Sequence, residues 1–217
     1  MNLKKINQNL QKALIENNII EPTELQSDCW GTLKGGADAI VVMNQGEGKS
    51  STIAYTVIQK LEKPIGESTR ALILVKDKES VLQMLDYFQK FGKHNDLRVI
   101  GVNDKTDIDE EKNVISAGMD ILIGTPNKIN AMFSGAGFNM NTVKIFVVDD
   151  ADLIFKQRLE PIVQRLSLSV EKTQRLFFTT ELTERVEILA DKIMIEPYLF
   201  GVEYDEDEYN EDEYNEE

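Results

Sequence analysis

A short run that is rich in glycine and ends in Lys-Ser, residues 45–50, has the residue types needed to bind phosphate. It follows the apolar stretch 39–43 and opens a segment with helical spacing that continues to Leu61. Glycine lets backbone N–H groups converge on an anion, and the N-terminus of a helix adds partial positive charge. Lys49 would then reach the terminal phosphates, and Ser50 would help to hold Mg²⁺. The alternative is a glycine-rich turn with a solvated lysine, but the placement of Lys-Ser favours nucleotide binding.

A second candidate is the acidic sequence at 149–152, which follows the apolar residues 146–148. At the end of a strand beside a phosphate loop, Asp149 can hold the Mg²⁺ shell and Asp150 can orient or deprotonate the attacking water. The alternative is a helix N-terminus, where acidic residues are favoured by the helix dipole. A phosphate loop about a hundred residues upstream favours the chemical interpretation.

Two weaker motifs also read as local structure. Thr23 and Gln26 have the spacing of a capping box, in which Thr23 caps a helix and Gln26 reaches back to its first residue. Thr125-Pro126 reads as a turn with proline near the start of a helix.

Short apolar segments alternate with helical ones along the chain. Strands are predicted at Asp38–Met43, Ala71–Val75, Leu97–Gly101, Ile121–Gly124, Ile145–Asp149 and Arg175–Thr179. Helices are predicted at Lys49–Leu61, Ser80–Phe91 and Thr183–Met194. This alternation predicts an α/β fold with a mainly parallel sheet covered on both faces. Ligands of such sheets lie beyond the carboxyl ends of the strands, where the motifs fall.

Together and in this order, the motifs resemble the first RecA-like domain of the DEAD-box RNA helicases, from about Ile6 to Phe200. Residues 22–26 resemble the adenine-reading Q motif, with Gln26 as the base-reading residue. Residues 45–50 match motif I, 149–152 align with Asp-Glu-Ala-Asp, and 177–181 occupy the place of the Ser-Ala-Thr motif. The resemblance implies a P-loop NTPase fold, a three-layer α/β/α sandwich.

The resemblance implies ATP, Mg²⁺ and RNA as ligands, and it assigns roles to individual residues. Those implied to bind nucleotide are Thr23, Gln26, Gln45, Gly46, Glu47, Gly48, Lys49, Ser50 and Ser51. Catalytic roles fall to Lys49, Asp149 and Asp150, and the metal ligands are Ser50 and Asp149. The residues implied to couple the nucleotide site to RNA are Asp152, Thr179 and Thr180. RNA contacts are implied for Lys76, Lys78, Thr125, Pro126 and Lys128.

Several positions depart from the family pattern. Asp150 replaces the catalytic Glu and is one methylene shorter, and an error of about 1 Å in a catalytic group costs on the order of a hundredfold in rate. Glu47 places a negative side chain in the phosphate loop, and Lys128 stands for an Arg. The family also needs a second RecA-like domain that supplies arginine fingers. That domain, or a full-length helicase acting in trans, is the partner that the resemblance implies.

Charge is concentrated at the C-terminus. The net charge is −14, and residues 203–217 carry ten acidic residues and no Lys or Arg, which leaves −4 for the rest. Such a segment cannot bury enough apolar surface to fold, so it predicts a disordered acidic tail after a domain at 1–202. Proteins that bind nucleic acid through charge alone have a basic surface, whereas the rest of this chain has a negative net charge. Weak RNA contact is therefore expected.

The chain contains one cysteine, Cys29, no apolar run of bilayer length and no secretory leader, so we expect a cytoplasmic protein without membrane contact. The favoured function is a DEAD-box-helicase-like ATP-binding module that hydrolyses ATP slowly or not at all and does not unwind duplexes alone. The alternative is a degenerate, non-catalytic interaction module that regulates a full-length helicase or binds basic partners through the tail. The plain Met1 start and the repeated tail favour a naturally one-domain chain over an excised half.

Overall fold

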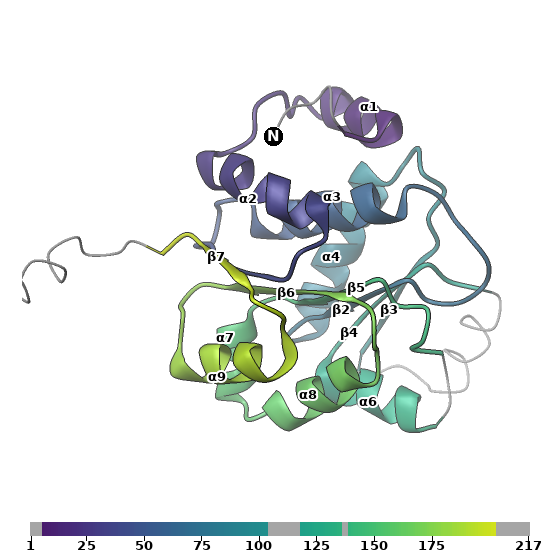
Figure 1. The fold of residues 1–217 in the computed structure, drawn as a ribbon. Coiled ribbons are helices and arrows are strands. Elements are labelled where there is room, and N and C mark those ends of the chain that lie inside the picture. Colours follow the sequence, from purple (N-terminus) through teal and green to yellow (C-terminus); the bar gives the residue numbers. More distant parts are fainter. Residues whose placement is uncertain (1–5, 104–117, 136–138, 203–217) are drawn as a thin grey trace, which may run out of the picture.

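The computed structural model describes residues 6–103, 118–135 and 139–202. The strands in this part are β1 (Ala39–Val42), β2 (Ala71–Leu74), β3 (Val99–Val102), β4 (Ile121–Gly124), β5 (Ile145–Val148), β6 (Gln174–Thr179) and β7 (Tyr198–Phe200). They form one parallel sheet in the order β3-β4-β2-β5-β6-β1-β7 (Figure 1). The tail predicted at 203–217 lies outside the described residues.

Helices cover both faces of this sheet. One face carries α1 (Gln8–Glu16), α2 (Glu24–Gly35), α3 (Lys49–Leu61) and α4 (Lys78–Phe91). The other carries α6 (Pro126–Ser134), α7 (Ala151–Lys156), α8 (Glu160–Leu168) and α9 (Glu184–Ile193) (Figure 1). None of the described helices has both the length and the apolar character needed to cross a bilayer.

The strands are apolar on both sides because each side packs against a helical layer. In β2, Ile73 joins the core under α1–α4, whereas its neighbours Leu72 and Leu74 join the core under α6–α9. Successive strand residues point to opposite faces, so a strand covered on both sides must be apolar throughout. The predicted three-layer α/β/α sandwich is confirmed.

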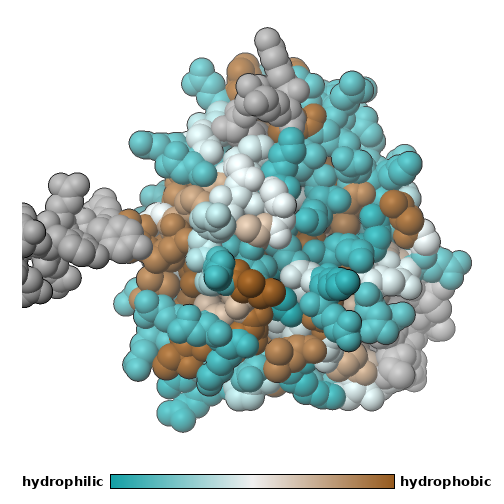
Figure 2. Space-filling view, viewed as in Figure 1, coloured by the Kyte–Doolittle hydropathy of each residue, from teal (hydrophilic) through white to brown (hydrophobic). Residues whose placement is uncertain are grey.

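Some predicted boundaries differ from the structure. β3 begins at Val99 rather than Leu97, because Arg98 uses its backbone N–H to bind the Asp120 side chain at 3.1 Å. α4 begins at Lys78 rather than Ser80, because Asp77 caps it by accepting from the Ser80 N–H at 2.8 Å. β7 was not predicted, since it has three residues and leaves Tyr198 56% exposed. Apolar surface gathers around this edge strand in Figure 2.

The register of the central strands places four loops at one edge of the sheet. Leu74 pairs with Val148, Val148 with Phe177, and Val42 with Thr179. The chain segments that follow β1, β2, β5 and β6 are therefore neighbours, although they are far apart in sequence. The sheet thus gathers the phosphate-loop and acidic motifs at one site.

A buried carboxylate stabilises the other edge of the sheet, where β2, β3 and β4 begin. The Asp120 side chain has no exposed surface and accepts hydrogen bonds from Arg70 Nη2 at 2.7 Å and Arg98 Nε at 2.9 Å. Burial works to raise the pKa of Asp120, but the hydrogen bonds from Arg98 and Arg70 outweigh it and hold that pKa below its usual value. This cluster ties together the segments that lead into β2, β3 and β4, and no local pattern of residues predicts it.

Candidate nucleotide-binding site

The phosphate loop has a backbone that suits glycine and leaves a helix N-terminus open. Gly46 and Gly48 adopt φ values of 94° and 93°, which L-residues with a side chain rarely adopt. Gly48 is the N-cap of α3 and supplies no side-chain acceptor, so the first N–H groups of α3 lack a side-chain cap. A Cβ at Gly48 would also lie only 2.7 Å from Gln26 Nε2. The loop is therefore shaped for an anion at the start of α3.

A cleft of about 510 Å³ opens beside this loop, at the carboxyl edge of the sheet. Its lining residues are Gln45, Gly46, Gly48, Lys49, Ser50, Lys76, Ser80, Gln83, Tyr87, Asp149, Asp150, Leu153 and Thr180. Sequence reasoning missed Ser80, Gln83 and Tyr87 of α4. Their i, i+3, i+7 spacing, directly after a predicted strand, is the signal that could have found them.

Two lysines and two aspartates form a charged cluster in the cleft. Lys49 Nζ forms an ion pair with Asp150 Oδ1 and lies 3.1 Å from Asp149 Oδ1. Lys76 Nζ lies 2.8 Å from Asp150 Oδ2. The cluster balances its own charge, so an incoming nucleotide must draw Lys49 away from at least one carboxylate.

Asp149 and Ser50 fit a Mg²⁺ ion held together with nucleotide phosphates. Asp149 is 5% exposed, and among the described residues its Oδ1 has no hydrogen-bond donor, since Lys49 approaches it only as an ion pair. Burial raises the pKa of Asp149, and Lys49 opposes that rise. Mg²⁺ in nucleotide sites is usually held by one or two carboxylates plus phosphates and water. A buried, acceptor-only oxygen in the same cleft as the Ser50 hydroxyl meets that requirement.

Glu47 does not enter the cleft. Its carboxylate accepts hydrogen bonds from the Asn44 backbone N–H at 2.8 Å and from Asn44 Nδ2 at 3.2 Å. It lines a separate hollow that also contains Thr23. The negative side chain in the loop is therefore turned away from the place where phosphate would bind.

Gln26 links α2 to the phosphate loop. Its Oε1 accepts from the Thr23 N–H at 3.1 Å, and Thr23 Oγ1 accepts from the Gln26 N–H at 3.3 Å, which completes a capping box. Its Nε2 lies 3.0 Å from Thr52 Oγ1 and 3.3 Å from both Gly48 O and Ser51 Oγ. The Gln26 amide is thus fully engaged within the protein. To read adenine, it must exchange part of this network for the base.

Replacing Gln26 with alanine should weaken ATP binding and abolish any preference for ATP over GTP. An amide can donate and accept on one edge of adenine, and the same amide orients the loop at Gly48. Competition of ATP and GTP against a fluorescent nucleotide measures the preference. Thr183→Ala is a matched control, because it removes the cap of α9 without touching the cleft. A preference that survives in Gln26→Ala would show that Thr23 and Gln26 serve only as a capping box.

The residues predicted to couple ATP and RNA are in direct contact. The Asp152 carboxylate accepts from Thr180 Oγ1 at 2.7 Å and from Thr179 Oγ1 at 2.9 Å. Burial works to raise the pKa of Asp152, but the hydrogen bonds from Thr180 and Thr179 outweigh it and lower that pKa. Asp152 lies in the first turn of α7, Thr179 ends β6 and Thr180 follows it, so these hydrogen bonds connect α7 to the end of β6. Their coupling role stays a prediction.

The predicted RNA-binding residues differ in how far they are exposed. Lys78 is exposed at the start of α4, while Thr125 and Pro126 are buried where α6 begins. Lys128 is 5% exposed, so its ammonium group is not presented to solvent in this conformation. Lys76 faces the charged cluster of the cleft. RNA contact by these residues stays a prediction.

A parallel sheet with a phosphate loop after β1 and two carboxylates after β5 defines a nucleotide-binding domain of the RecA-like class. The family model described as DEAD/DEAH box helicase matches residues 23–189, and the chain belongs to that family. It is therefore a helicase-like ATP-binding module.

Individual proteins show the same relationship. The chain is 28% identical over 200 residues to a probable ATP-dependent RNA helicase DDX46 of Danio rerio, which covers 88% of this chain and 20% of that protein. It is 24% identical over 202 residues to the ATP-dependent RNA helicase eIF4A of Eremothecium gossypii, covering 93% of this chain and 51% of the relative. The chain thus spans between a fifth and about half of these relatives.

A solved structure shares the fold. The crystal structure of a DEAD box protein from the hyperthermophile Methanococcus jannaschii superposes with a TM-score of 0.83 at 21% identity, over 90% of this chain and 54% of that one. The match covers one RecA-like domain.

Proposed function

We propose that this chain binds ATP with Mg²⁺ in the cleft beside residues 45–50, with Lys49 on the terminal phosphates and Ser50 and Asp149 on the metal. The observation that carries the proposal is the convergence of three features at one edge of the sheet. These are the N-terminus of α3, which has no side-chain cap, Lys49, and the buried Asp149 oxygen that pairs with Lys49. Mg²⁺ would supply charge for the phosphates, and this chain's residues would bind and orient the nucleotide.

We further propose that hydrolysis by this chain alone is slow or absent. In this proposal Asp150 would orient the attacking water, but its short side chain is engaged by Lys49 and Lys76. A second RecA-like domain in trans would have to supply arginine fingers, which are worth about 10³–10⁵ in rate in related phosphoryl-transfer systems. The same reasoning predicts no duplex unwinding by the chain alone.

RNA contact is proposed to be weak. Of the predicted RNA-binding cations, Lys78 is exposed, whereas Lys76 and Lys128 are engaged or buried in this conformation. Phosphate contacts supply most of the affinity for nucleic acid, and few exposed cations at this face therefore mean low affinity.

Calorimetry with ATP, ADP and GTP in the presence of Mg²⁺ tests the central proposal. We expect saturable heat with ATP, little phosphate release, and no strand separation of a labelled RNA duplex. The absence of heat and of any thermal shift at millimolar nucleotide would rule out ATP binding. Fast phosphate release by the chain alone would contradict the role assigned to the second domain.

A non-catalytic interaction module remains the second candidate. The observation that favours it is the self-balanced cluster, in which Lys49 is already neutralised by Asp149 and Asp150. If nucleotide does not bind but the chain alters the ATPase activity of a full-length helicase, this second function is correct.

Deleting residues 203–217 should tighten RNA binding at low salt and leave the melting temperature nearly unchanged. The ten carboxylates of this segment compete with RNA for the cations of the domain. This competition weakens with salt, because the Debye length is only about 10 Å at 0.1 M. Anisotropy with single-stranded RNA at two salt concentrations measures the effect. A tail of equal length with Asn and Gln replacing Asp and Glu is the matched control, and it should bind RNA like the deletion. Loss of folding on deletion would show a structural role.

We propose a cytoplasmic location, because a chain with one cysteine, Cys29, cannot form an intrachain disulfide. Its thiol is buried and unpaired, and burial raises its pKa to about 12, which makes it unreactive. Recovery of the native protein from an oxidising compartment would contradict this location.

A further inference from the structure

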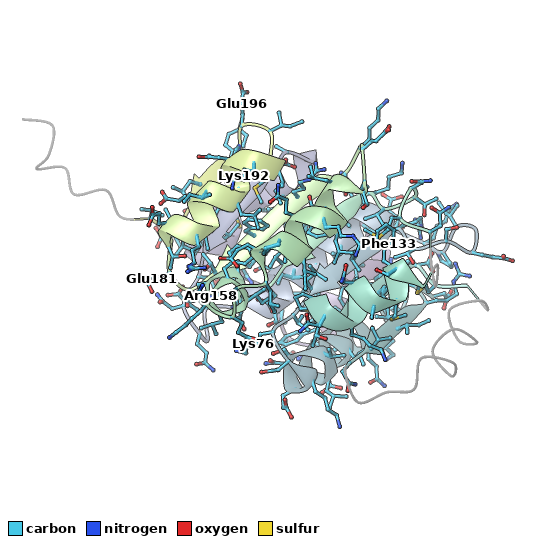
Figure 3. The ribbon with its side chains drawn as sticks, turned by 90° about the horizontal axis from the view of Figure 1, so that it is seen from below. Lys76, Phe133, Arg158, Glu181, Lys192 and Glu196 are labelled. Carbon is cyan, nitrogen blue, oxygen red and sulfur yellow. The ribbon has the colours of Figure 1, made fainter. Side chains whose placement is uncertain are left out.

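Lys76 lies in the nucleotide cleft, although the sequence suggested an RNA contact for it. It follows β2 directly, and Figure 3 labels it among the side chains of the structure. Leu74 and Val148 pair across β2 and β5, so Lys76 and Asp150 each lie two residues beyond a paired position. Sheet register therefore brings the two residues side by side, with Lys76 Nζ 2.8 Å from Asp150 Oδ2.

The two oxygens of Asp150 contact different lysines. Oδ1 pairs with Lys49 and Oδ2 pairs with Lys76. Asp150 is only 9% exposed, and its backbone adopts the left-handed conformation at the start of α7, with a φ of 54°. The carboxylate is thus held in a partly desolvated position, where loss of a counter-ion is costly.

Binding of a nucleotide would change this arrangement. When Lys49 turns to the phosphates, Asp150 loses the cation on Oδ1 while a polyanion enters the same cleft. Lys76 approaches Oδ2 from the end of β2 and not from the phosphate loop, so its contact with Asp150 does not require Lys49 to stay in place. It would then offset the repulsion between Asp150 and the nearest phosphate.

We propose that Lys76 is the counter-ion of Asp150 that allows the cleft to accept a terminal phosphate, and that it thereby sets the preference for ATP over ADP. This proposal rests on the proposed function, in which Asp150 orients the water that attacks the terminal phosphate. ADP lacks that phosphate and is less sensitive to an uncompensated charge on Asp150. Lys76 is thus a positioning residue that acts through Asp150.

The test is a double-mutant cycle measured by equilibrium binding of ATP and ADP with Mg²⁺ to the full chain. Lys76→Met should weaken ATP binding roughly tenfold and change ADP binding by less than about twofold. In an Asp150→Asn background, the same substitution should change ATP binding by less than about twofold, because no charge remains to be compensated. Lys76→Arg should restore binding. Lys63→Met is the matched control, since Lys63 is exposed just beyond the opposite end of α3.

A second measurement needs no nucleotide. The melting temperature of the ligand-free protein should fall with Lys76→Met in the wild-type background and stay nearly constant in the Asp150→Asn background. Three results would overturn the proposal: equal weakening of ATP and ADP, a penalty that persists in Asp150→Asn and so marks a direct phosphate ligand, or a change in RNA affinity alone. Failure of the proposed function itself is distinct, since the unaltered protein would then bind neither nucleotide.

Discussion

Replacing Lys49 with alanine should raise the dissociation constant for ATP by about a hundredfold, because truncating one partner of a buried charge pair costs about 2–5 kcal/mol. Lys49 lines the cleft at the start of α3 and is the cation of the phosphate loop. Its loss would also leave Asp149 and Asp150 facing the phosphates with less compensation. Calorimetric titration with Mg²⁺ and ATP measures the change.

Lys63→Ala is the control for this experiment, because it removes an exposed lysine away from the cleft. It should bind ATP like the unaltered protein. Melting curves of both variants separate loss of binding from loss of folding. ATP affinity within about fivefold of the unaltered protein in Lys49→Ala would contradict the assignment of the phosphate site.

Replacing Asp120 with alanine should lower the free energy of unfolding by about 3 kcal/mol, which corresponds to a fall in melting temperature of roughly 6–12 °C for a chain of this size. The substitution leaves Arg70 and Arg98 without the carboxylate that holds them together at the amino edge of the sheet. Both arginines keep some exposure, so water can hydrate part of the charge that is left. Thermal and urea unfolding measure the loss.

Lowering the pH should weaken the same interaction between Asp120 and the two arginines. The pKa of Asp120 is lowered in the folded protein, whereas the unfolded chain has a pKa near the usual value of about 3.9. As the pH falls, the unfolded chain binds the proton first, so this contribution to stability is present above about pH 4 and is lost below it. Asp120→Asn should therefore show a weaker loss of stability in acid. Asp191→Ala, which removes an exposed carboxylate of α9, is the control and should change stability little. Equal acid profiles for Asp120→Asn and the unaltered protein would contradict the argument.

The parts of the site that are local in sequence could be predicted. A phosphate loop was indicated by Gly48-Lys49-Ser50, which follows an apolar strand and opens a helix. An acidic strand end was indicated by Asp149-Asp150, which follows the apolar strand β5. The helix at 49–61 was predicted with its observed ends because its apolar periodicity starts and stops there. β7 was missed because three half-exposed residues carry no periodic signal.

The sequence by itself determined that a parallel sheet gathers phosphate-binding and acidic residues at its carboxyl edge, because residue type and apolar periodicity act over a few neighbouring positions. The tertiary structure alone decided which side chains meet. It placed Lys76 against Asp150, buried Lys128, and closed the cluster at Asp120. The Lys76–Asp150 and Asp120 contacts depend on the strand order β3-β4-β2-β5, which is set by packing between segments distant in the chain and has no local signal.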